Sequence, residues 1–404
     1  MQYSHIAVVL GLCPNGLGVI RSLGKQGIRV IGLDYKPGGF GFYTRYLNVA
    51  LLCPNPIREP KAMCDYLLNL GSKTEGNSVL FPASDEFVLF ISRFRYELEK
   101  KFLFALPSDS TTELLMNKRW QYSLLADSGV TIPQTFYPES LNDVKMIQDI
   151  ILYPAIVKPC YTHIWKEKGF TVKGFIVNDR FELRETIESV FDNDLEVAVQ
   201  SIIPGPVTNL YEVCCYLNKK SEPLCVFIKR KIRQYPNDAG VGSMVESIRL
   251  DSLASEAVKV FQRIRYHGIG EIEYKLDPRD SHFKMIEMNA RITLQNSLAD
   301  YCGINFPLVQ YQDLIGINPK YKSHYKEKKR WLWIEMDYES FKALKKEKKI
   351  SWLRWLKSVI GCRTFAVISC KDIKPFMKFV SEAVRKKIIF YIKKLRKNAH
   401  SFLL

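Results

Sequence analysis

Two carboxylates and an amide lie close together in a segment whose pattern is typical of a β-hairpin. Glu273 lies on the expected first strand, and Glu287 and Asn289 lie on the second. Because side chains alternate across a strand, Glu287 and Asn289 point to the same face, and a short loop places Glu273 roughly opposite Glu287. Hard oxygen ligands of this kind suit Mg²⁺, which usually takes one or two carboxylates and completes its shell with nucleotide phosphates.

Two alternatives remain open for this hairpin. Glu271 shares the face of Glu273 and competes with it as a metal ligand. The acidic strand surface is also explained as a solvated one that Lys275 and Lys284 of the same hairpin neutralise. The residues by themselves do not decide between a metal site and a solvated strand.

Two lysines have the charge that a polyphosphate needs. Lys158 ends the apolar strand YPAIVKP, where the following Pro159 restricts the backbone and a point charge can reach phosphate oxygens. Lys118 ends an apolar stretch earlier in the chain. Each lysine alone is typical of an ordinary surface charge, so its role as a phosphate ligand depends on the motifs around it.

The apolar segment VAVQSIIPG breaks at Pro204 and Gly205. Such a break leaves backbone N–H and C=O groups available to bind the edge of an adenine, and Ile202 and Ile203 would cover its face. The alternative is a strand that ends in an ordinary turn.

The elements that would position these residues indicate an α/β protein. Residues 6–10 predict a buried strand, glycines and a helix to about residue 26 follow, and a second strand covers 28–34. This is the start of a parallel βαβ unit. Its glycine spacing differs from the dinucleotide fingerprint, so NAD or FAD binding is not expected. Further on, residues 114–129 predict one helix closed by Gly129.

A second acidic pair, Asp85 and Glu86, follows the apolar segment VLFP after two intervening residues. Open α/β sheets bind ligands at the carboxyl ends of their strands, so this pair is a candidate substrate contact. The alternative is an acidic first turn of a helix.

The excess positive charge is confined to the C-terminal region. The 404 residues include 59 Lys+Arg and 42 Asp+Glu, for a formal net charge of +17. Residues 317–404 hold 24 of these basic and 7 of these acidic residues, so the first 316 residues are neutral. The asymmetry predicts that the C-terminal region is a separate functional unit. It argues against nucleic-acid binding by the protein as a whole.

Apolar and basic segments alternate in this C-terminal region. An apolar row follows one helical face from Phe376 through Val380, Val384, Ile388, Ile392 and Leu395. A basic amphipathic helix rich in aromatic residues is typical of an anionic membrane surface. The alternatives are a helix that packs on the protein's own core with a solvated basic face and, third, an RNA-binding segment.

Composition and cysteine usage indicate a cytoplasmic globular protein. The ten cysteines show no CxxC or Cys/His spacing, so we expect neither a disulfide framework nor a zinc site. No apolar run approaches the ~18 residues of a membrane-spanning helix. The first residues lack the basic region and cleavage site of a signal peptide.

The order of these motifs resembles the ATP-grasp superfamily. The matching motifs are Lys118, YPAIVKP with Lys158, VQSIIPG, Glu273 and IEMNAR, within residues 1–316. The resemblance implies an α/β protein that is α+β in its ATP-grasp part. The domains it implies are a Rossmann-like pre-ATP-grasp domain (1–115), an ATP-grasp domain (116–316) with a lid subdomain at about 135–200, and a basic C-terminal extension (317–404).

The resemblance also implies a role for each candidate residue. Lys118 and Lys158 would hold the ATP phosphates, and Arg291 would steady the transferring phosphate or acyl group. The nucleotide-binding segment would comprise Gln200, Ser201, Ile202 and Ile203, with 201–203 facing the adenine. The Mg²⁺ ligands would be Glu273, Glu287 and Asn289. The candidates for an anionic substrate or the γ-phosphate would be Arg230, Lys231 and Arg233, with Arg233 counted as catalytic beside Arg291 and Lys158.

Two features depart from the family pattern. The loop after Lys158, CYTHIWKEKGF, contains a single glycine, Gly169, whereas this loop is glycine-rich in many members. Lys173 is a candidate to replace part of the phosphate-binding backbone that those glycines would supply. The acid that binds ribose usually follows the adenine segment closely, whereas the first acid here is Glu212.

The resemblance implies an ATP-dependent ligase that forms C–N bonds. A carboxylate would attack the γ-phosphate to give an acyl phosphate, and an amine would then displace phosphate. ATP and Mg²⁺ are the implied cofactors, with two metal ions expected and Mn²⁺ as a substitute. The implied substrates are an amino acid and a cell-envelope or polysaccharide precursor at the inner membrane face, by similarity to D-aspartate ligases. The alternatives are a carboxylase or phosphoryl-transfer relative, and a non-catalytic nucleotide-binding protein tethered to a membrane.

Overall fold

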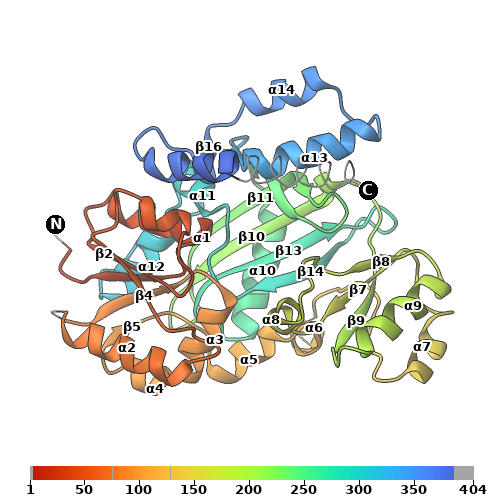
Figure 1. Cartoon of the computed structure of the whole chain (residues 1–404), viewed down its shortest axis with the longest axis horizontal. Coiled ribbons are helices and arrows are strands. Elements are labelled where there is room, and N and C mark those ends of the chain that lie inside the picture. The colour runs from red at the N-terminus through yellow and green to blue at the C-terminus, as the bar shows by residue number, and fades with distance from the viewer. Residues whose placement is uncertain (1–2, 75, 128, 386–404) are drawn as a thin grey trace, which may run out of the picture.

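Three β-sheets organise the part of the chain that the computed structural model describes, residues 3–74, 76–127 and 129–385 (Figure 1). A parallel sheet lies at the N-terminal end, a long sheet crosses the middle, and a small antiparallel sheet lies on the far side. The predicted combination of α/β and α+β architecture is confirmed.

The N-terminal sheet has five parallel strands in the order β3-β2-β1-β4-β5. Its strands are β1 (Ala7–Leu10), β2 (Val30–Asp34), β3 (Val49–Leu52), β4 (Ser78–Pro82) and β5 (Phe102–Leu103). Its helices are α1 (Pro14–Gly24), α2 (Pro60–Ser72), α3 (Asp85–Arg93) and α4 (Arg95–Leu98), with a 3₁₀ turn at Phe40–Tyr43. All four residues of β1 are fully buried, as expected where helices cover both faces of a parallel sheet. The predicted βαβ start is confirmed.

The small sheet has the order β6-β9-β7-β8, and its strand pairs are antiparallel. Its strands are β6 (Thr135–Phe136), β7 (Ala155–Pro159), β8 (Phe175–Val177) and β9 (Val197–Ser201). The helices α7 (Leu141–Ile147), α8 (Thr162–Glu167) and α9 (Arg180–Phe191) belong to the same part of the chain. Buried Val144, Val157 and Ile187 share a hydrophobic cluster of this part.

The central sheet has seven strands in the order β14-β13-β10-β11-β12-β15-β16. Its strands are β10 (Leu210–Leu217), β11 (Pro223–Tyr235), β12 (Val241–Ile248), β13 (Gly268–Leu276), β14 (Phe283–Asn289), β15 (Arg330–Leu332) and β16 (Thr364–Phe365). Its helices are α10 (Asp251–Arg263), α11 (Asn296–Cys302) and α12 (Phe306–Leu314), and a 3₁₀ turn covers Val207–Asn209. Strands β13 and β14 form the predicted hairpin, and Glu273 stands opposite Glu287 in it.

The prediction of one helix over 114–129 is wrong. Two helices, α5 (Asp109–Met116) and α6 (Lys118–Asp127), meet at Asn117, whose backbone is extended (φ −101°, ψ 121°). The Asn117 side chain accepts a hydrogen bond from the backbone N–H of Arg119 at 2.8 Å. Asparagine competes for helical N–H groups in this way and favours helix starts over helix interiors. The break makes Lys118 the first residue of a helix.

The described part of the C-terminal region is joined to the central sheet. Strand β15 pairs antiparallel with β12, and its Trp331 is fully buried. Helices α13 (Ile334–Lys346) and α14 (Trp352–Ile360) lie over one end of that sheet (Figure 1). These residues are therefore continuous with the central sheet, while a separate function of the C-terminal region and the position of each domain boundary stay predictions.

The predicted apolar row of the C-terminal region is partly described. Residues 374–385 are helical, and Val380 and Val384 are exposed on that helix. The remaining row positions, 388, 392 and 395, lie outside the described residues. Within residues 3–385, apart from the two undescribed positions, no helix has the length and apolarity needed to cross a membrane.

Candidate functional site

A row of charged residues crosses four strands of the central sheet at one level. The strand register pairs Lys229 of β11 with Glu212 of β10, Glu212 with Glu273 of β13, and Glu273 with Glu287 of β14. Residues in register across a sheet share a face and lie within contact distance. The predicted ribose ligand, Glu212, thus stands beside the predicted metal ligands.

Two buried lysines neutralise the acids of this row. Lys231 Nζ lies 2.8 Å from Glu273 Oε1 and 3.7 Å from Glu212 Oε1, and Lys229 Nζ lies 3.2 Å from Glu212 Oε2. Burial lowers the pKa of Lys231, but the charges of Glu273 and Glu212 more than offset this and raise it above its ordinary value. The two carboxylates therefore favour the charged form of the Lys231 ammonium group.

Helix α6 lies against the edge strand β14 and brings Lys118 to Glu287. The Gln121 side chain donates a hydrogen bond to Met288 O at 2.8 Å and accepts one from Met288 N at 3.0 Å, in place of a neighbouring strand. Lys118 Nζ then donates to the Glu287 carboxylate. Burial raises the pKa of Glu287, but the charges of Lys118 and Lys173 outweigh burial and hold the pKa well below its usual range.

Lys158 projects from β7 toward the same helix. Its ammonium group donates to Gln200 Oε1 at 2.7 Å and to the Tyr122 hydroxyl. Burial, together with the charge of Lys118, lowers the pKa of Lys158 to about 7. Sequence reasoning missed Tyr122, although its i,i+4 spacing from Lys118 on one helix would have placed the two on the same face.

These contacts bring Lys118, Lys158, Glu273 and Glu287 together from four elements. Ammonium groups beside a pair of carboxylates can bind a polyphosphate and its divalent cation at once. The side chains of Glu287 and Glu273 are 27% and 11% exposed, so both can be reached from outside.

The donor set fits Mg²⁺ completed by phosphate oxygens. Two carboxylates from opposed strand positions and a nearby amide, Asn289, are hard oxygen donors. Across the described ranges, no group of three His, Cys, Asp or Glu side chains could hold a metal ion alone. The protein thus offers a partial shell, as expected for a magnesium ion that enters with a nucleotide.

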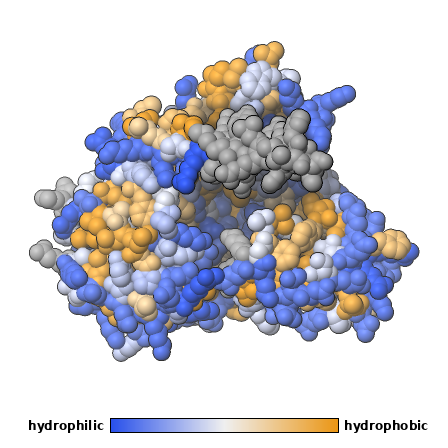
Figure 2. Space-filling view, viewed as in Figure 1, coloured by the Kyte–Doolittle hydropathy of each residue, from blue (hydrophilic) through white to orange (hydrophobic). Residues whose placement is uncertain are grey.

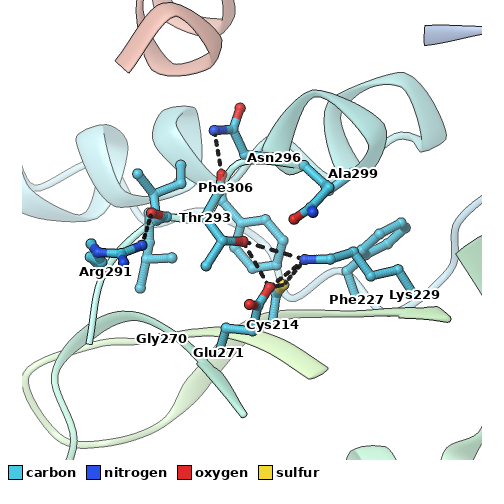
Figure 3. A pocket seen from close by; sticks show the side chains of 13 residues that line it. Cys214, Phe227, Lys229, Gly270, Glu271, Arg291, Thr293, Asn296, Ala299 and Phe306 are labelled. Carbon is cyan, nitrogen blue, oxygen red and sulfur yellow. Dashed lines mark hydrogen bonds and ion pairs between the residues drawn. The ribbon is translucent and has the colours of Figure 1, made fainter. Parts of the chain in front are cut away.

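A small pocket lies beside the charged row (Figure 3). In it, Lys229 forms an ion pair with Glu271. Thr293 Oγ1 donates to Glu271 Oε2 at 2.7 Å, and Cys214 Sγ donates to the same oxygen at 3.0 Å. Glu271, the competing metal ligand, is therefore committed to three partners inside the pocket. Both signs of charge line this space.

Arg291 also lines the pocket and links the central sheet to the N-terminal sheet. Its Nε lies 2.6 Å from Asp85 Oδ1, at the start of α3. Burial lowers the pKa of Arg291, but Asp85 outweighs it and raises the pKa above its ordinary value. The acidic pair at 85 and 86 thus begins a helix, and Asp85 also binds a candidate catalytic residue.

Arg233 and Arg230 do not join the cluster. The Arg233 guanidinium binds both oxygens of Asp337 on α13, each at 2.9 Å. A register shift in β11 between Lys231 and Arg233 separates these two side chains. Arg230 lies 3.1 Å from Glu246, which also binds Arg330 at 3.0 Å. These two arginines are committed to ion pairs within the protein.

The glycine-poor loop after Lys158 is folded around an aromatic residue. Trp165 of α8 is buried, stacks on Phe170 with ring centroids 4.4 Å apart, and donates its Nε1 hydrogen to Val172 O at 2.8 Å. Lys173 follows this segment and is exposed. An aromatic anchor therefore stands where many family members use glycines.

The predicted adenine-binding segment follows β9. Ile203 is buried, and its carbonyl oxygen accepts a hydrogen bond from Lys275 Nζ at 2.6 Å. The backbone N–H of Ile202 donates to Pro154 O at 2.9 Å. Lys275, considered above as a partner of the acidic strand, instead holds the end of this segment.

The chain is similar to known proteins in both sequence and structure. Residues 242–322 match the family described as carbamoyl-phosphate synthase L chain, ATP binding domain. The D-aspartate ligase of Enterococcus faecium (strain Aus0004) is 22% identical over 315 residues, which cover 74% of this chain and 74% of that protein. The biotin carboxylase domain of Hydrogenobacter thermophilus 2-oxoglutarate carboxylase, solved with MgADP, ADP and bicarbonate, superposes with a TM-score of 0.64 at 16% identity, covering 81% of this chain and 74% of that one.

The chain has the ATP-grasp fold. A further ATP-grasp neighbour, the L-amino acid ligase from Bacillus licheniformis, has a TM-score of 0.58 at 16% identity and covers 78% of this chain and 75% of that one. The predicted resemblance to ligases that form C–N bonds is confirmed by these relatives. The role of each individual site residue stays a prediction.

Proposed function

We propose that the chain is an ATP-dependent carboxylate–amine ligase. The observation that carries this proposal is the meeting of Lys118 and Lys158 with the opposed pair Glu273 and Glu287. In the proposed reaction the lysines bind phosphate oxygens and the glutamates hold the metal ion. Positioning and charge neutralisation are the main contributions that phosphoryl transfer needs from a protein.

Mg²⁺ would be held by Glu273, Glu287 and Asn289, with a second ion expected and Mn²⁺ as a substitute. When bound, the metal would neutralise negative charge on the phosphoryl oxygens. The residues of this chain would do the rest: Lys118 would exchange its Glu287 partner for a phosphate oxygen, and Lys231 would remain with Glu273.

The pocket beside the row is lined by charged groups that are already paired, Lys229 with Glu271 and Arg291 with Asp85. To bind a substrate carboxylate or ammonium group, each would have to exchange its present partner. An acyl phosphate formed next to Arg291 would need protection from water, which the segment around Trp165 could give on closing over the nucleotide.

The substrates we propose are an amino acid and an anionic cell-envelope or polysaccharide precursor. Two relatives support the amino-acid half, because one is a D-aspartate ligase and the other an L-amino acid ligase. The basic C-terminal region supports the anionic half and a place at the inner face of a membrane.

The test is a screen of amino acids against acidic envelope precursors, measuring ADP release and product mass with Mg²⁺ present. We expect ADP only when both an acid and an amine are supplied, and we expect Lys158→Ala to abolish it. Lys145→Ala is the matched control, because Lys145 is an exposed lysine on α7. Full activity of Lys158→Ala would refute the site.

Two other outcomes would reject the ligase proposal in favour of another function. ADP formation that needs bicarbonate and no amine would identify a carboxylase, which the likeness to a biotin carboxylase domain makes the second candidate. Nucleotide binding without turnover for every acid and amine pair would identify a non-catalytic binding protein.

A further inference from the structure

Helix α14 presents an apolar face to solvent. Trp352, Leu353, Leu356 and Ile360 are 47%, 69%, 38% and 68% exposed. At 3.6 residues per turn, these four positions fall on one side of the helix. Figure 2 shows apolar side chains gathered over α14 at the top of the molecule. An exposed row of this kind on a surface helix marks an interaction site.

The opposite side of α14 is anchored, so the orientation of the apolar face is fixed. Trp355 is buried, donates its Nε1 hydrogen to Asp337 Oδ2 at 2.8 Å, and stacks on Phe341 of α13 with ring centroids 4.8 Å apart. Ser351 caps the helix by accepting a hydrogen bond from Arg354 N. Leu353, Leu356 and Ile360 therefore project away from the protein, while Trp352 packs one side of its ring on Phe341 and Trp355 and leaves the rest exposed.

A basic rim surrounds this face. Residues 342–357 include seven Lys or Arg and one Glu. Lys345, Lys346 and Lys348 are exposed at the end of α13 and in the loop that leads to α14. Arg354 and Lys357 are exposed on α14 itself, next to its apolar side. An apolar centre with a cationic edge is the pattern of a helix that lies in the interface of an anionic bilayer.

We infer that α14 docks this protein on an anionic lipid bilayer, with its four apolar side chains inserted between headgroups and the basic rim on lipid phosphates. Charge complementarity selects this occupant. A second copy would bring an identical basic rim against the first, and residues 386–404 hold six Lys or Arg and no acid, so both would be repelled. A nucleic acid would match the rim but would leave the aliphatic side chains without partners.

The experiment uses the full chain and sedimentation with phosphatidylcholine vesicles that contain or lack phosphatidylglycerol. We expect binding only to the anionic vesicles, weakening as salt rises. We expect Leu353→Glu with Ile360→Glu to reduce binding about tenfold or more. The matched control is Met146→Glu with Phe181→Glu, two side chains of similar exposure (66% and 67%) on other helices, and we expect it to bind like the wild type.

Lys345→Glu with Lys346→Glu is a second variant that leaves the apolar face intact. We expect it to bind less tightly and to respond less to salt. Unchanged binding of both α14-region variants would overturn the inference, as would equal binding to neutral vesicles. A dimer in solution that Leu353→Glu with Ile360→Glu dissolves, or RNA binding in place of vesicle binding, would also overturn it. We expect Leu353→Glu with Ile360→Glu to leave ADP release in solution unchanged, because both side chains are exposed and outside the candidate site, so this result and that of the ligase assay are separable.

Discussion

Ion pairs between basic and acidic side chains occur in two regions of this protein, and the two regions differ in how tightly each acid is held. In the candidate site, the side chain of Glu287 is 27% exposed and has Lys118 as its cation. In the C-terminal region, Asp337 has no exposed surface and binds Arg233 through both of its oxygens, while Ser243 and Trp355 donate to it at 3.0 and 2.8 Å.

A second acid of the C-terminal region repeats this pattern. Asp372 is buried against the N-terminal part of the chain, where Arg21 Nε lies 2.8 Å away, Thr44 Oγ1 donates at 2.6 Å and Arg45 N donates at 3.0 Å. A carboxylate with several fixed donors cannot change partners without leaving buried charge behind. A carboxylate shared with one flexible lysine can exchange it for a metal ion. The first arrangement suits attachment of a segment, and the second suits a site that binds and releases ligands.

The largest expected effect is on stability, at Asp337. Asp337→Ala would leave the buried Arg233 guanidinium and two further donors unpaired, so we expect a loss of about 3–5 kcal/mol in the free energy of unfolding. Chemical denaturation measures it. Glu335→Ala is the control in the same helix, because Glu335 is not fully buried. A loss as small as that of the control would contradict the distinction between the two regions.

The opposite response is expected at Glu287. Glu287→Gln keeps the side-chain shape and removes the charge, so we expect ADP formation to fall about 10²–10³-fold. We expect the free energy of unfolding to fall less than in Asp337→Ala, because the Glu287 side chain is 27% exposed. ADP release and denaturation, measured on the same preparation, check both halves. Glu185→Gln, at an exposed position of α9, should change neither quantity. Strong destabilisation by Glu287→Gln would show that the ion pair between Lys118 and Glu287 serves to stabilise the fold.

The lowered pKa of Lys158 makes nucleotide affinity depend on pH. Because this pKa is about 7 in the protein without nucleotide, the lysine loses its charge as pH rises above 7, and binding of an anionic phosphate must then take up a proton. We expect the affinity for ATP to be highest below pH 7 and to fall toward a limit of about tenfold per pH unit above it. Titration calorimetry from pH 6 to 9 measures this.

Lys158→Arg is a second test of Lys158 as the titrating phosphate ligand. An arginine stays charged throughout this range, so the fall in affinity above pH 7 should disappear. Lys145→Arg should keep the wild-type profile. A wild-type affinity that does not change between pH 6 and 9 would reject Lys158 as the titrating phosphate ligand.

The smallest expected effect is at Tyr122. Tyr122→Phe removes one hydrogen-bond acceptor of the buried Lys158 ammonium group. Loss of this hydrogen bond destabilises the charged lysine by about 1 kcal/mol and so lowers the pKa of Lys158 further. ATP affinity at pH 7 should fall a few-fold, with a smaller change at pH 6. A loss that is equal at both pH values would mean that Tyr122 acts through packing alone.

Local pattern in the sequence was sufficient for the elements that carry the candidate metal ligands. Alternation of side chains in the hairpin correctly placed Glu273 opposite Glu287, because strand geometry has a fixed period of two residues. The strand before Lys158 and the first βαβ unit were also predicted, since both depend on continuous apolar runs. The helix break at Asn117 was missed, although an asparagine before Lys118 was a local signal for it.

The order of motifs in the sequence by itself predicted the ATP-grasp fold, and local periodicity predicted which residues share a face. Tertiary structure alone decided which basic residue meets which acid. Lys231 and Arg233 are two positions apart, yet one binds Glu273 and the other Asp337, more than a hundred residues further along the chain. The partner of a buried charge is chosen by long-range packing, because the cost of burying it must be offset by whichever opposite charge the fold brings near.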